Sequence, residues 1–318
     1  MKPKQTITST ILYQIRKDAS SLIKAAPSMI FCLDWLEINC GEINVNFIED
    51  ELKLKRYFSS SNYRDGKVYE SKTKKGFRVS IYKGKYKRKN ESNSFINRIA
   101  FNPSQLSGYS ELEQFLEKII IKNKKHQIHR IDYSFKFNSN ICSVDSFFTT
   151  ASVMNKQICS KYYKNKLRSG KLAYMSYGKL PLRITCYDRN GKPKHKKPEP
   201  FINFEIQTSK SKNKKLPIKI IQELPKLLQF NPLKTVHFYD QKDIAIKSKN
   251  GRYKTGRRFV ALNYKYGFTM AKTLYHDLYD NYDRIKKMSP ALSLKSGLEF
   301  KELMLNEYKK QLTKYLNS

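Results

Sequence analysis

Three polar side chains, one phenol and two carboxylates, occur in short segments in which apolar and polar residues alternate. Asp132 lies in "RIDYSFKF", Tyr187 in "LRITCYD" and Glu205 in "FINFEIQ". Successive side chains of a β-strand point to opposite faces, so each of the three falls on the more polar face of its strand. If the strands pair in one antiparallel sheet whose apolar side is covered by helices, the three groups project together from the open side.

A phenol beside two carboxylates can attack a phosphodiester. Carboxylate oxygens are ligands of hard divalent cations, so Asp132 and Glu205 are the predicted ligands of Mg²⁺ or Mn²⁺, which would neutralise charge on the phosphate. A phenol has a pKa of about 10, so Lys192 or Lys194 would help to ionise Tyr187. Attack on DNA would leave a 5′-phosphotyrosine and a free 3′-OH.

Each of these residues also has a simpler interpretation. A tyrosine on a strand usually packs or stacks, and Asp132 can form an ion pair with Arg130 on the same face. Glu205 can pair with one of many lysines. Taken one at a time, these interpretations are favoured, and the joint placement of the three groups is what favours chemistry.

Two histidines and one cysteine are weaker candidates. His126 and His129 are three residues apart, so their side chains would point to opposite faces of a strand. They are therefore predicted to be ordinary surface or phosphate-contact histidines and not a metal-binding pair. Cys186 points to the apolar side and is predicted to be a small core residue.

The composition indicates a folded, strongly basic protein. Of 318 residues, 39% are hydrophobic and 13% aromatic, which is enough for a core. The 63 Lys and Arg residues against 27 Asp and Glu give a net charge of +36, which predicts a nucleic acid partner. The apolar runs are far shorter than the roughly 20 residues of a membrane span, and the first residues lack the apolar stretch of a secretion signal. We therefore expect an intracellular protein with no membrane partner.

The five cysteines are odd in number and form no CxxC pair, so neither a disulfide framework nor a zinc knuckle is expected.

Periodicity predicts a mixture of helices and strands. The expected elements are a helix at 11–25, a strand at 31–47 broken at Gly41, a basic β-hairpin arm at 53–90, a helix with Ser110 as its N-cap, a helix at 143–166, strands at 172–177, 182–188 and 201–207, an apolar helix at 216–230 interrupted by Pro225, a basic hairpin turning at Asn250-Gly251, and a mostly helical tail at 271–316.

Basic residues interleaved with tyrosines are predicted to bind nucleic acid. Cations neutralise phosphates while aromatic rings stack on unpaired bases, which suits DNA that is partly opened. The predicted DNA-binding residues are Lys83, Lys85, Lys87, Arg88, Arg130, Arg183, Arg252, Lys254, Arg257 and Arg258.

The order of these motifs resembles that of rolling-circle replication initiators of plasmids and small phages, in particular the Rep_trans type and the related filamentous-phage gene II type. The resemblance rests on "LDWLEIN" at 33–39, the "RID" strand at 130–137, "YMSYGKLPLRITCYDRNGK" at 174–192 and "NFEIQ" at 203–207. It covers about residues 31 to 207. The C-terminal third has no counterpart in it.

The resemblance implies an enzyme that nicks one strand of origin DNA and rejoins it through a phosphotyrosine. It places the nucleophile at Tyr187 and the metal-binding acids at Asp132 and Glu205, and the free 3′-OH would prime a host polymerase. The chain departs from the family pattern because Thr185 and Cys186 separate Ile184 from the tyrosine. Arg189 and Asn203 also replace a usual lysine and a usual arginine, in that order.

We therefore expect an α+β fold, a curved antiparallel sheet with helices packed on one face, basic β-hairpin arms and a helical C-terminal region. The expected divisions are an N-terminal helical segment at 1–30, a nickase domain at 31–265 with its motifs at 130–207, and a helical region at 266–318. Expected partners are single-stranded or locally opened origin DNA, host helicase and polymerase, and a second copy of the chain, in the cytoplasm of a bacterial host. The alternatives are a non-catalytic basic nucleic-acid-binding protein and a recombinase or relaxase-like nickase.

Overall fold

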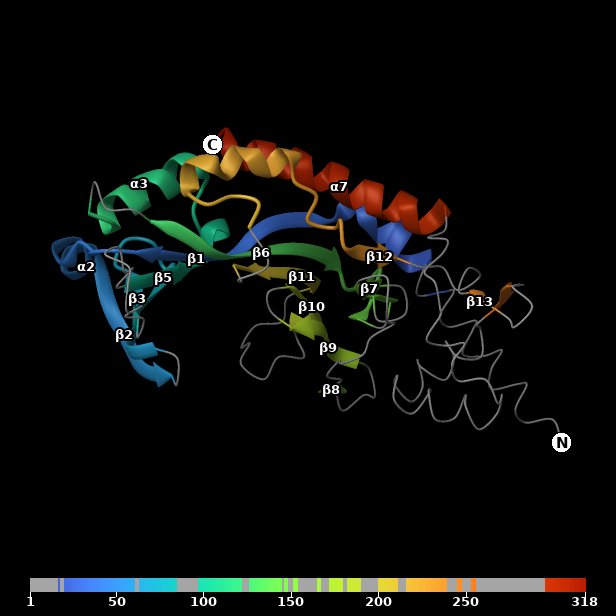
Figure 1. Cartoon of the computed structure of the whole chain (residues 1–318), viewed down its shortest axis with the longest axis horizontal. Coiled ribbons are helices and arrows are strands. Elements are labelled where there is room, and N and C mark those ends of the chain that lie inside the picture. The colour runs from blue at the N-terminus through green and yellow to red at the C-terminus, as the bar shows by residue number, and fades with distance from the viewer. Residues whose placement is uncertain are drawn as a thin grey trace. The chain divides into compact units, whose positions relative to one another are not determined.

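The chain divides into two compact units, each assembled from segments that are far apart in sequence (Figure 1). Unit 1 comprises Met1–Ile30, Phe135–Ile206 and Pro232–Tyr308, and unit 2 comprises Phe31–Ser134, Gln207–Asn231 and Lys309–Ser318. The computed structural model describes residues 17, 20–60, 63–84, 97–121, 126–144, 146–147, 151–153, 165–166, 172–179, 182–189, 200–210, 216–238, 245–247, 253–255 and 295–318.

Unit 2 contains a sheet whose strands are hydrogen-bonded in the order β2-β3-β4-β5-β1-β6. The pairs β2·β3, β3·β4, β4·β5 and β5·β1 are antiparallel. Its elements are β1 (Ile30–Cys40), α2 (Val45–Glu51), β2 (Leu52–Ser60), β3 (Tyr63–Ser71), β4 (Arg78–Gly84), β5 (Asn97–Phe101), η2 (Pro103–Gln105), α3 (Tyr109–Ile119), the first part of β6 (Gln127–Asn138) and η4 (Ile221–Gln229).

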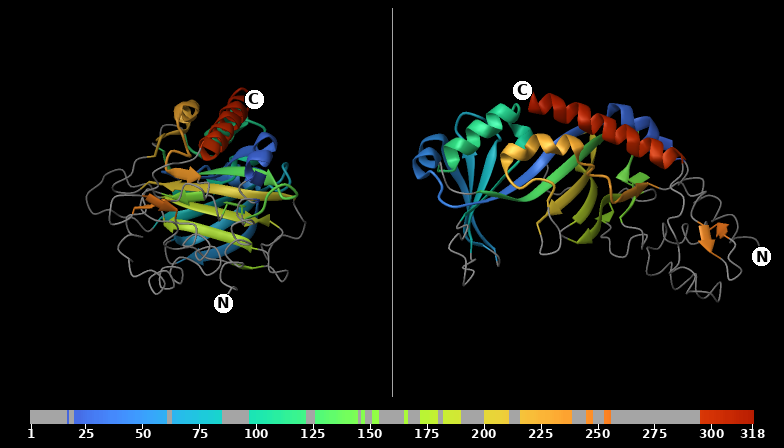
Figure 2. Two further views of the ribbon diagram at one scale, coloured as in Figure 1. Left: turned by 90° about the vertical axis from the view of Figure 1, so that its right-hand side faces the viewer. Right: turned by 45° about the horizontal axis from the view of Figure 1, so that its top comes forward.

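Helix α3 covers one face of this sheet (Figure 2). Its buried residues Leu112, Phe115, Leu116 and Ile119 recur at helical spacing and form one apolar stripe. The Phe115 ring lies edge-on to Phe77 and to Phe101, with centroids 5.1 Å apart in both pairs. These contacts make the α3 side of the sheet the apolar core of unit 2.

Unit 1 contains strands in the order β6-β11-β10-β9-β8, and the β10·β9 and β8·β9 pairs are antiparallel. Its elements are η1 (Ala26–Ser28), the end of β6, β7 (Ala151–Val153), β8 (Asn165–Lys166), β9 (Leu172–Lys179), β10 (Leu182–Asp188), most of β11 (Phe201–Ser209), β12 (Val236–Phe238), β13 (Ala245–Lys247), β14 (Tyr253–Thr255) and most of α7 (Lys295–Leu316).

Aromatic rings form the core of unit 1. Phe204 of β11 stacks on Phe147 with centroids 4.9 Å apart and also contacts Phe135 and Phe238. Phe300 of α7 lies edge-on to Phe238 at 4.8 Å, so α7 packs on the apolar side of these strands.

The α+β class predicted from the sequence is confirmed, with antiparallel strand pairs and a helix on the apolar face of each unit. The 53–90 arm contains the hairpin β2–β3, and register shifts between Leu54 and Arg56 and between Phe58 and Ser60 bend it. The strands of the second basic hairpin are present, because β13 pairs antiparallel with β14 at Ala245↔Thr255 and Lys247↔Tyr253, and the predicted turn at Asn250-Gly251 lies outside the described residues.

Three predicted elements are wrong in part. The strand expected to reach residue 47 ends at Cys40, because Asn44 caps α2 by accepting a hydrogen bond from Phe47 N. In the segment 143–166, expected to be one helix, Val144, Ser146 and Phe147 are helical, but Ala151–Val153 and Asn165–Lys166 are the strands β7 and β8, and β7 pairs with β12 at Val153↔Val236.

The N-cap of α3 is Gly108 rather than Ser110, whose backbone N–H donates to Ser318 O at 3.2 Å. A Cβ atom at residue 108 would collide with Ser318, so this close approach requires glycine.

The apolar segment at 216–230 forms the 3₁₀ helix η4, with Pro225 inside it. Residues 20–25 and 295–316 are helical, as predicted within the 11–25 and 271–316 segments, whose other residues lie largely outside the described part of the chain. Among the described segments, none of the helices combines the length and apolar character that a membrane span requires. The predicted divisions at residues 30 and 265 stay a prediction.

Candidate active site

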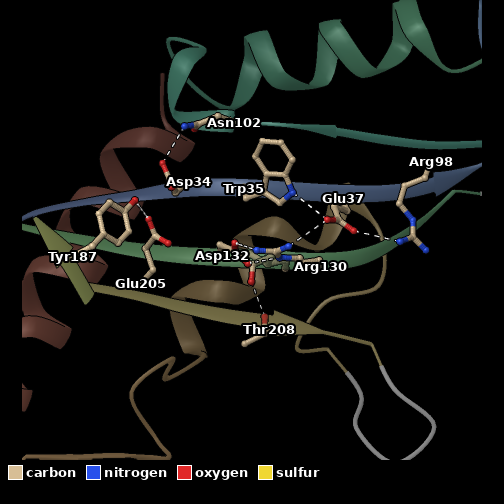
Figure 3. Close-up of polar contacts among 11 residues, drawn as sticks. Asp34, Trp35, Glu37, Arg98, Asn102, Arg130, Asp132, Tyr187, Glu205 and Thr208 are labelled. Atoms are coloured by element: carbon tan, nitrogen blue, oxygen red, sulfur yellow. Dashed lines mark hydrogen bonds and ion pairs between the residues drawn. The ribbon is translucent and has the colours of Figure 1, made fainter. Parts of the chain in front are cut away.

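Tyr187 and Glu205 lie together in unit 1, on the neighbouring strands β10 and β11 (Figure 3). The Tyr187 hydroxyl donates a short hydrogen bond to Glu205 Oε1 and accepts one from Asn203 Nδ2 at 3.1 Å. Alternation positions the cluster, because Ile184 and Cys186 on one strand and Ile202, Phe204 and Ile206 on the other point to the core. Two of the three groups singled out in the sequence are therefore in contact.

The polar face of these strands is buried, and the prediction of an open side is wrong. Tyr187 is 3% exposed, Glu205 5%, Asn203 0% and Thr185 3%. The physical reason is pairing: a phenol and a carboxylate can leave water when each satisfies the other.

Two buried polar atoms near the phenol have no hydrogen-bond partner among the described residues. They are Asn203 Oδ1, on the residue that donates to the phenol, and Thr185 Oγ1, two positions before Tyr187 on the same face. An unsatisfied buried oxygen costs free energy, and a site that keeps such atoms has capacity to bind a further donor.

Asp132 lies in unit 2 and is held by Arg130 (Figure 3). Arg130 Nε donates to Asp132 Oδ1 at 2.8 Å and Nη2 to Oδ2 at 2.5 Å. Burial raises the pKa of Asp132 to about 6, although Arg130 acts to lower it and the nearby carboxylates of Glu37 and Asp34 act to raise it. The simpler interpretation of Asp132, an ion pair with Arg130, therefore describes the structure.

Glu37 of β1 joins this ion pair to a wider network (Figure 3). Its Oε1 accepts from Trp35 Nε1 at 3.1 Å and from Arg130 Nη1 at 3.5 Å, and its Oε2 accepts from Arg98 Nη1 at 3.4 Å. Arg98 Nε also donates to Asn39 Oδ1 at 2.7 Å. Glu37 therefore contacts both Arg98 and Arg130.

The carboxylates as arranged do not fit a divalent cation. Both oxygens of Asp132 accept from Arg130, and Glu205 Oε1 accepts from the Tyr187 hydroxyl. Within the described ranges, no group of three or more His, Cys, Asp or Glu side chains could hold a metal ion. The predicted Mg²⁺ or Mn²⁺ site stays a prediction.

Of the comparisons with known proteins, only that with solved structures gives matches. No family model matches the chain, and no curated protein matches it. Among solved structures, the chain is similar to "Structure of Rolling Circle Replication Initiator Protein from Geobacillus stearothermophilus", with a TM-score of 0.41 and 13% sequence identity over 74% of this chain and 95% of that one. That protein is of the kind that the order of the sequence motifs resembles.

The predicted DNA-binding residues fall into three groups. Lys83 is exposed on β4, Arg183 is half-buried on β10, and Lys254 lies on β14 opposite Ile246. Arg130 is engaged by Asp132 and Glu37. Outside the described residues lie Lys85, Lys87, Arg88, Lys192, Lys194, Arg252, Arg257 and Arg258.

Sequence reasoning did not predict the roles of Asn203, Glu37, Arg98 and Trp35. Asn203 departs from the family pattern, and strand alternation places it on the same face as Glu205. Trp35 and Glu37 alternate within "LDWLEIN", and this alternation was the available signal. Arg98 carries no local signal, since only strand pairing brings it beside β1.

Proposed function

We propose that the protein initiates replication of its replicon by nicking one strand of origin DNA through Tyr187 and rejoining it. The observation that supports this function is the hydrogen bond from the Tyr187 hydroxyl to Glu205. A nucleophile whose proton is already bonded to a carboxylate, and whose oxygen accepts from an amide, is the arrangement needed for covalent catalysis.

The reaction would be a transesterification. The Tyr187 oxygen attacks the scissile phosphorus while its proton moves to Glu205. The bond between the phosphorus and the 3′ oxygen of the neighbouring nucleotide then breaks. The 3′ oxygen leaves and takes up the proton that Glu205 has received, which gives the free 3′-OH and restores the carboxylate. Because the phosphotyrosine ester replaces one phosphodiester bond with another, rejoining by the reverse reaction needs no ATP.

Glu205 alone is a weak base for this proton, because a free carboxyl group has a pKa of about 4.3 and a phenol about 10. Proton transfer must therefore be concerted with attack. Asn203 Nδ2 would stabilise charge on the phenolic oxygen through the bond that it already makes.

A requirement for Mg²⁺ or Mn²⁺, with Asp132 and Glu205 as ligands and Lys192 or Lys194 as nearby cations, is also part of the proposal. It rests on the sequence resemblance alone. A bound cation would neutralise phosphate charge, and Arg130, which engages both Asp132 oxygens, would have to release them to it. Single-stranded or locally opened origin DNA, host helicase and polymerase, and the bacterial cytoplasm belong to the proposal on the same ground.

Burial favours a second candidate, a non-catalytic nucleic-acid-binding protein. Tyr187 is 3% exposed, and a buried tyrosine bonded to a glutamate also stabilises a sheet without any chemistry. The net charge of +36 suits this candidate as well as the first.

Covalent capture of DNA separates the two candidates. The full chain is incubated with supercoiled DNA of its own replicon and Mg²⁺ or Mn²⁺, and protein–DNA adducts are resolved under denaturing conditions. We expect an adduct with wild type and none with Tyr187→Phe. Tyr109→Phe is the matched control, because Tyr109 also donates to a glutamate, Glu113 Oε1, at 2.5 Å but lies on α3. DNA binding without an adduct in wild type, or an adduct that survives Tyr187→Phe, would overturn the nicking function.

A further inference from the structure

Lys136, near the end of β6, lies on the polar face of unit 1 that carries Tyr187. Its neighbours Phe135 and Phe137 are 0% exposed, and the Phe135 ring contacts Phe204 in the aromatic core. Successive side chains of a strand point to opposite faces, so Lys136 points away from that core. Since β6 is hydrogen-bonded to β11 and β11 to β10, the lysine joins the face that contains the phenol.

Two contacts fix how β6 and β11 are paired within unit 1. The Ser139 N–H donates to Pro200 O at 2.8 Å, and the rings of Phe135 and Phe204 lie 6.5 Å apart between centroids. The chain runs from 139 back to 135 on one strand and from 200 forward to 204 on the other. The two strands are therefore antiparallel and keep one register between these contacts.

Asn203 is the residue directly opposite Lys136 in this register. The two residues lie three positions from the Ser139–Pro200 hydrogen bond, one before Ser139 and the other after Pro200. Hydrogen-bonded and non-hydrogen-bonded pairs alternate along an antiparallel ladder, so Lys136 and Asn203 form a non-hydrogen-bonded pair. Side chains approach each other most closely in such pairs, whose Cα atoms are about 4.5 Å apart.

Both members of this pair have unused hydrogen-bonding groups. Within the described ranges, the Lys136 ammonium forms no ion pair and no hydrogen bond, although its side chain is half-buried. Asn203 Oδ1 likewise has no partner there, and Asn203 is 0% exposed. The other end of the Asn203 amide donates to the Tyr187 hydroxyl. A cation and an acceptor that both lack partners beside a phenol are features of a site that binds a ligand.

We propose that the Lys136 ammonium binds the scissile phosphate while Tyr187 attacks it. An anionic ligand is expected because the unpaired group is a cation, and the choice of a DNA phosphate rests on the proposed function. An ammonium has three N–H donors, so Lys136 can donate to a non-bridging phosphate oxygen and to Asn203 Oδ1 together. The second bond would keep the Asn203 Nδ2 group turned toward the phenol.

Lys136 stays protonated in this reaction and forms no covalent bond. The proton of Tyr187 still moves to Glu205 and then to the 3′ oxygen, as described above. The positive charge of Lys136 offsets the negative charge that develops on the phosphate oxygens during attack. Because the ammonium is held on a strand before the reaction begins, little reorganisation is needed to stabilise this charge.

The rate of adduct formation tests this role. The full chain in excess is mixed with supercoiled DNA of its own replicon and Mg²⁺, and samples quenched at set times are resolved under denaturing conditions. Lys136→Met removes the charge from a side chain of similar length, so the adduct should form about a hundred-fold to a thousand-fold more slowly than with wild type. Lys136→Arg restores a cation and should form the adduct at least about ten-fold faster than Lys136→Met.

Lys301→Met is the matched control, because it makes the same change at another half-buried lysine of unit 1. Lys301 lies on α7, which packs on the apolar side of the strands, and its Nζ donates to Val236 O at 3.1 Å. The adduct should form at the wild-type rate. Urea unfolding excludes a folding defect as the cause: Lys136→Met loses no bond and should keep the wild-type midpoint, whereas Lys301→Met should unfold at a lower concentration.

The salt dependence of DNA binding gives a second measurement, which a purely structural lysine would not change. Fluorescein-labelled oligothymidylate is titrated with the full chain at several salt concentrations and followed by fluorescence anisotropy. Lys136→Met should lower the slope of log affinity against log salt by about 0.7, the value for one phosphate contact with a single strand. Lys301→Met should keep the wild-type slope.

Failure of this inference and failure of the nicking function give different results. If Lys136→Met forms the adduct at the wild-type rate, or if Lys301→Met is slowed as much, Lys136 has no special role and the nicking function stands. If wild type forms no adduct, the nicking function fails. The slope then decides the matter for Lys136 alone: a reduced slope supports phosphate binding, and an unchanged slope overturns it.

Discussion

The hydrogen bonds of the Tyr187 hydroxyl set the size of the effect that its removal has on folding. Tyr187→Phe deletes one bond to a charged carboxylate, about 1.5–3 kcal/mol, and one to a neutral amide, about 0.5–1.5 kcal/mol. Both partners are buried, so water does not replace the lost bonds. The free energy of unfolding should therefore fall by about 2–4.5 kcal/mol, an effect that a tyrosine held only by surface contacts would not produce.

A double-mutant cycle with Glu205→Met isolates the bond to the carboxylate. In the Glu205→Met background, Tyr187→Phe removes only the bond from Asn203 and should cost about 0.5–1.5 kcal/mol. The coupling between the two positions is then about 1.5–3 kcal/mol. Equilibrium urea unfolding followed by circular dichroism supplies the four free energies.

Additive costs at Tyr187 and Glu205, within about 0.5 kcal/mol, would refute the reasoning, because contacting groups that share a buried bond must be coupled. Tyr109→Phe is again the control. Its half-buried partner Glu113 can be hydrated after the change, so its cost should lie at the lower end of the range for one hydrogen bond.

Three further predictions concern the two units and the proposed cation. The pKa of Asp132 is about 6 in the folded protein and about 3.9 in the unfolded chain. The contribution of Asp132 to the free energy of unfolding therefore falls by roughly 3 kcal/mol as the pH rises from 4 to 6. His129, with its pKa lowered to about 4, contributes a rise over the same window, so urea unfolding should show stability rising with pH in Asp132→Asn and falling in His129→Gln. Phe204→Ala should cost about 3–5 kcal/mol by urea unfolding, against less than about 0.5 for Val45→Ala, whose side chain is exposed. Removing divalent cations with EDTA should abolish the covalent adduct while gel-shift measurements show unchanged DNA binding.

Strand faces were predictable because they depend on local periodicity. Alternation placed Cys186 toward the core and Tyr187 and Glu205 on the other face, and the bonds of Tyr187 agree with that assignment. The apolar stripe of α3 and the pairing of β13 with β14 were predictable for the same reason. In each case the pattern lies within one short segment.

Elements whose conformation depends on distant partners were not predictable. The apolar residues of 143–166 predict one helix, and Val144, Ser146 and Phe147 are helical, yet β7 forms further on because β12, far along the chain, offers a strand edge to pair with. The start of α3 depends on Ser318, which occupies the space that a side chain at Gly108 would need. The short stretch of sequence around β7 does not contain β12, and the stretch around Gly108 does not contain Ser318.

The sequence by itself determined the α+β class, the parity of each strand and the basic character of the protein, because composition and alternation are properties of the chain alone. Only the tertiary structure decided that the polar face around Tyr187 is buried, that Asp132 is held by Arg130, and that Glu37 contacts both Arg98 and Arg130. Burial and pairing depend on which strands become neighbours. That choice is made by long-range packing, where each buried charge must find a partner.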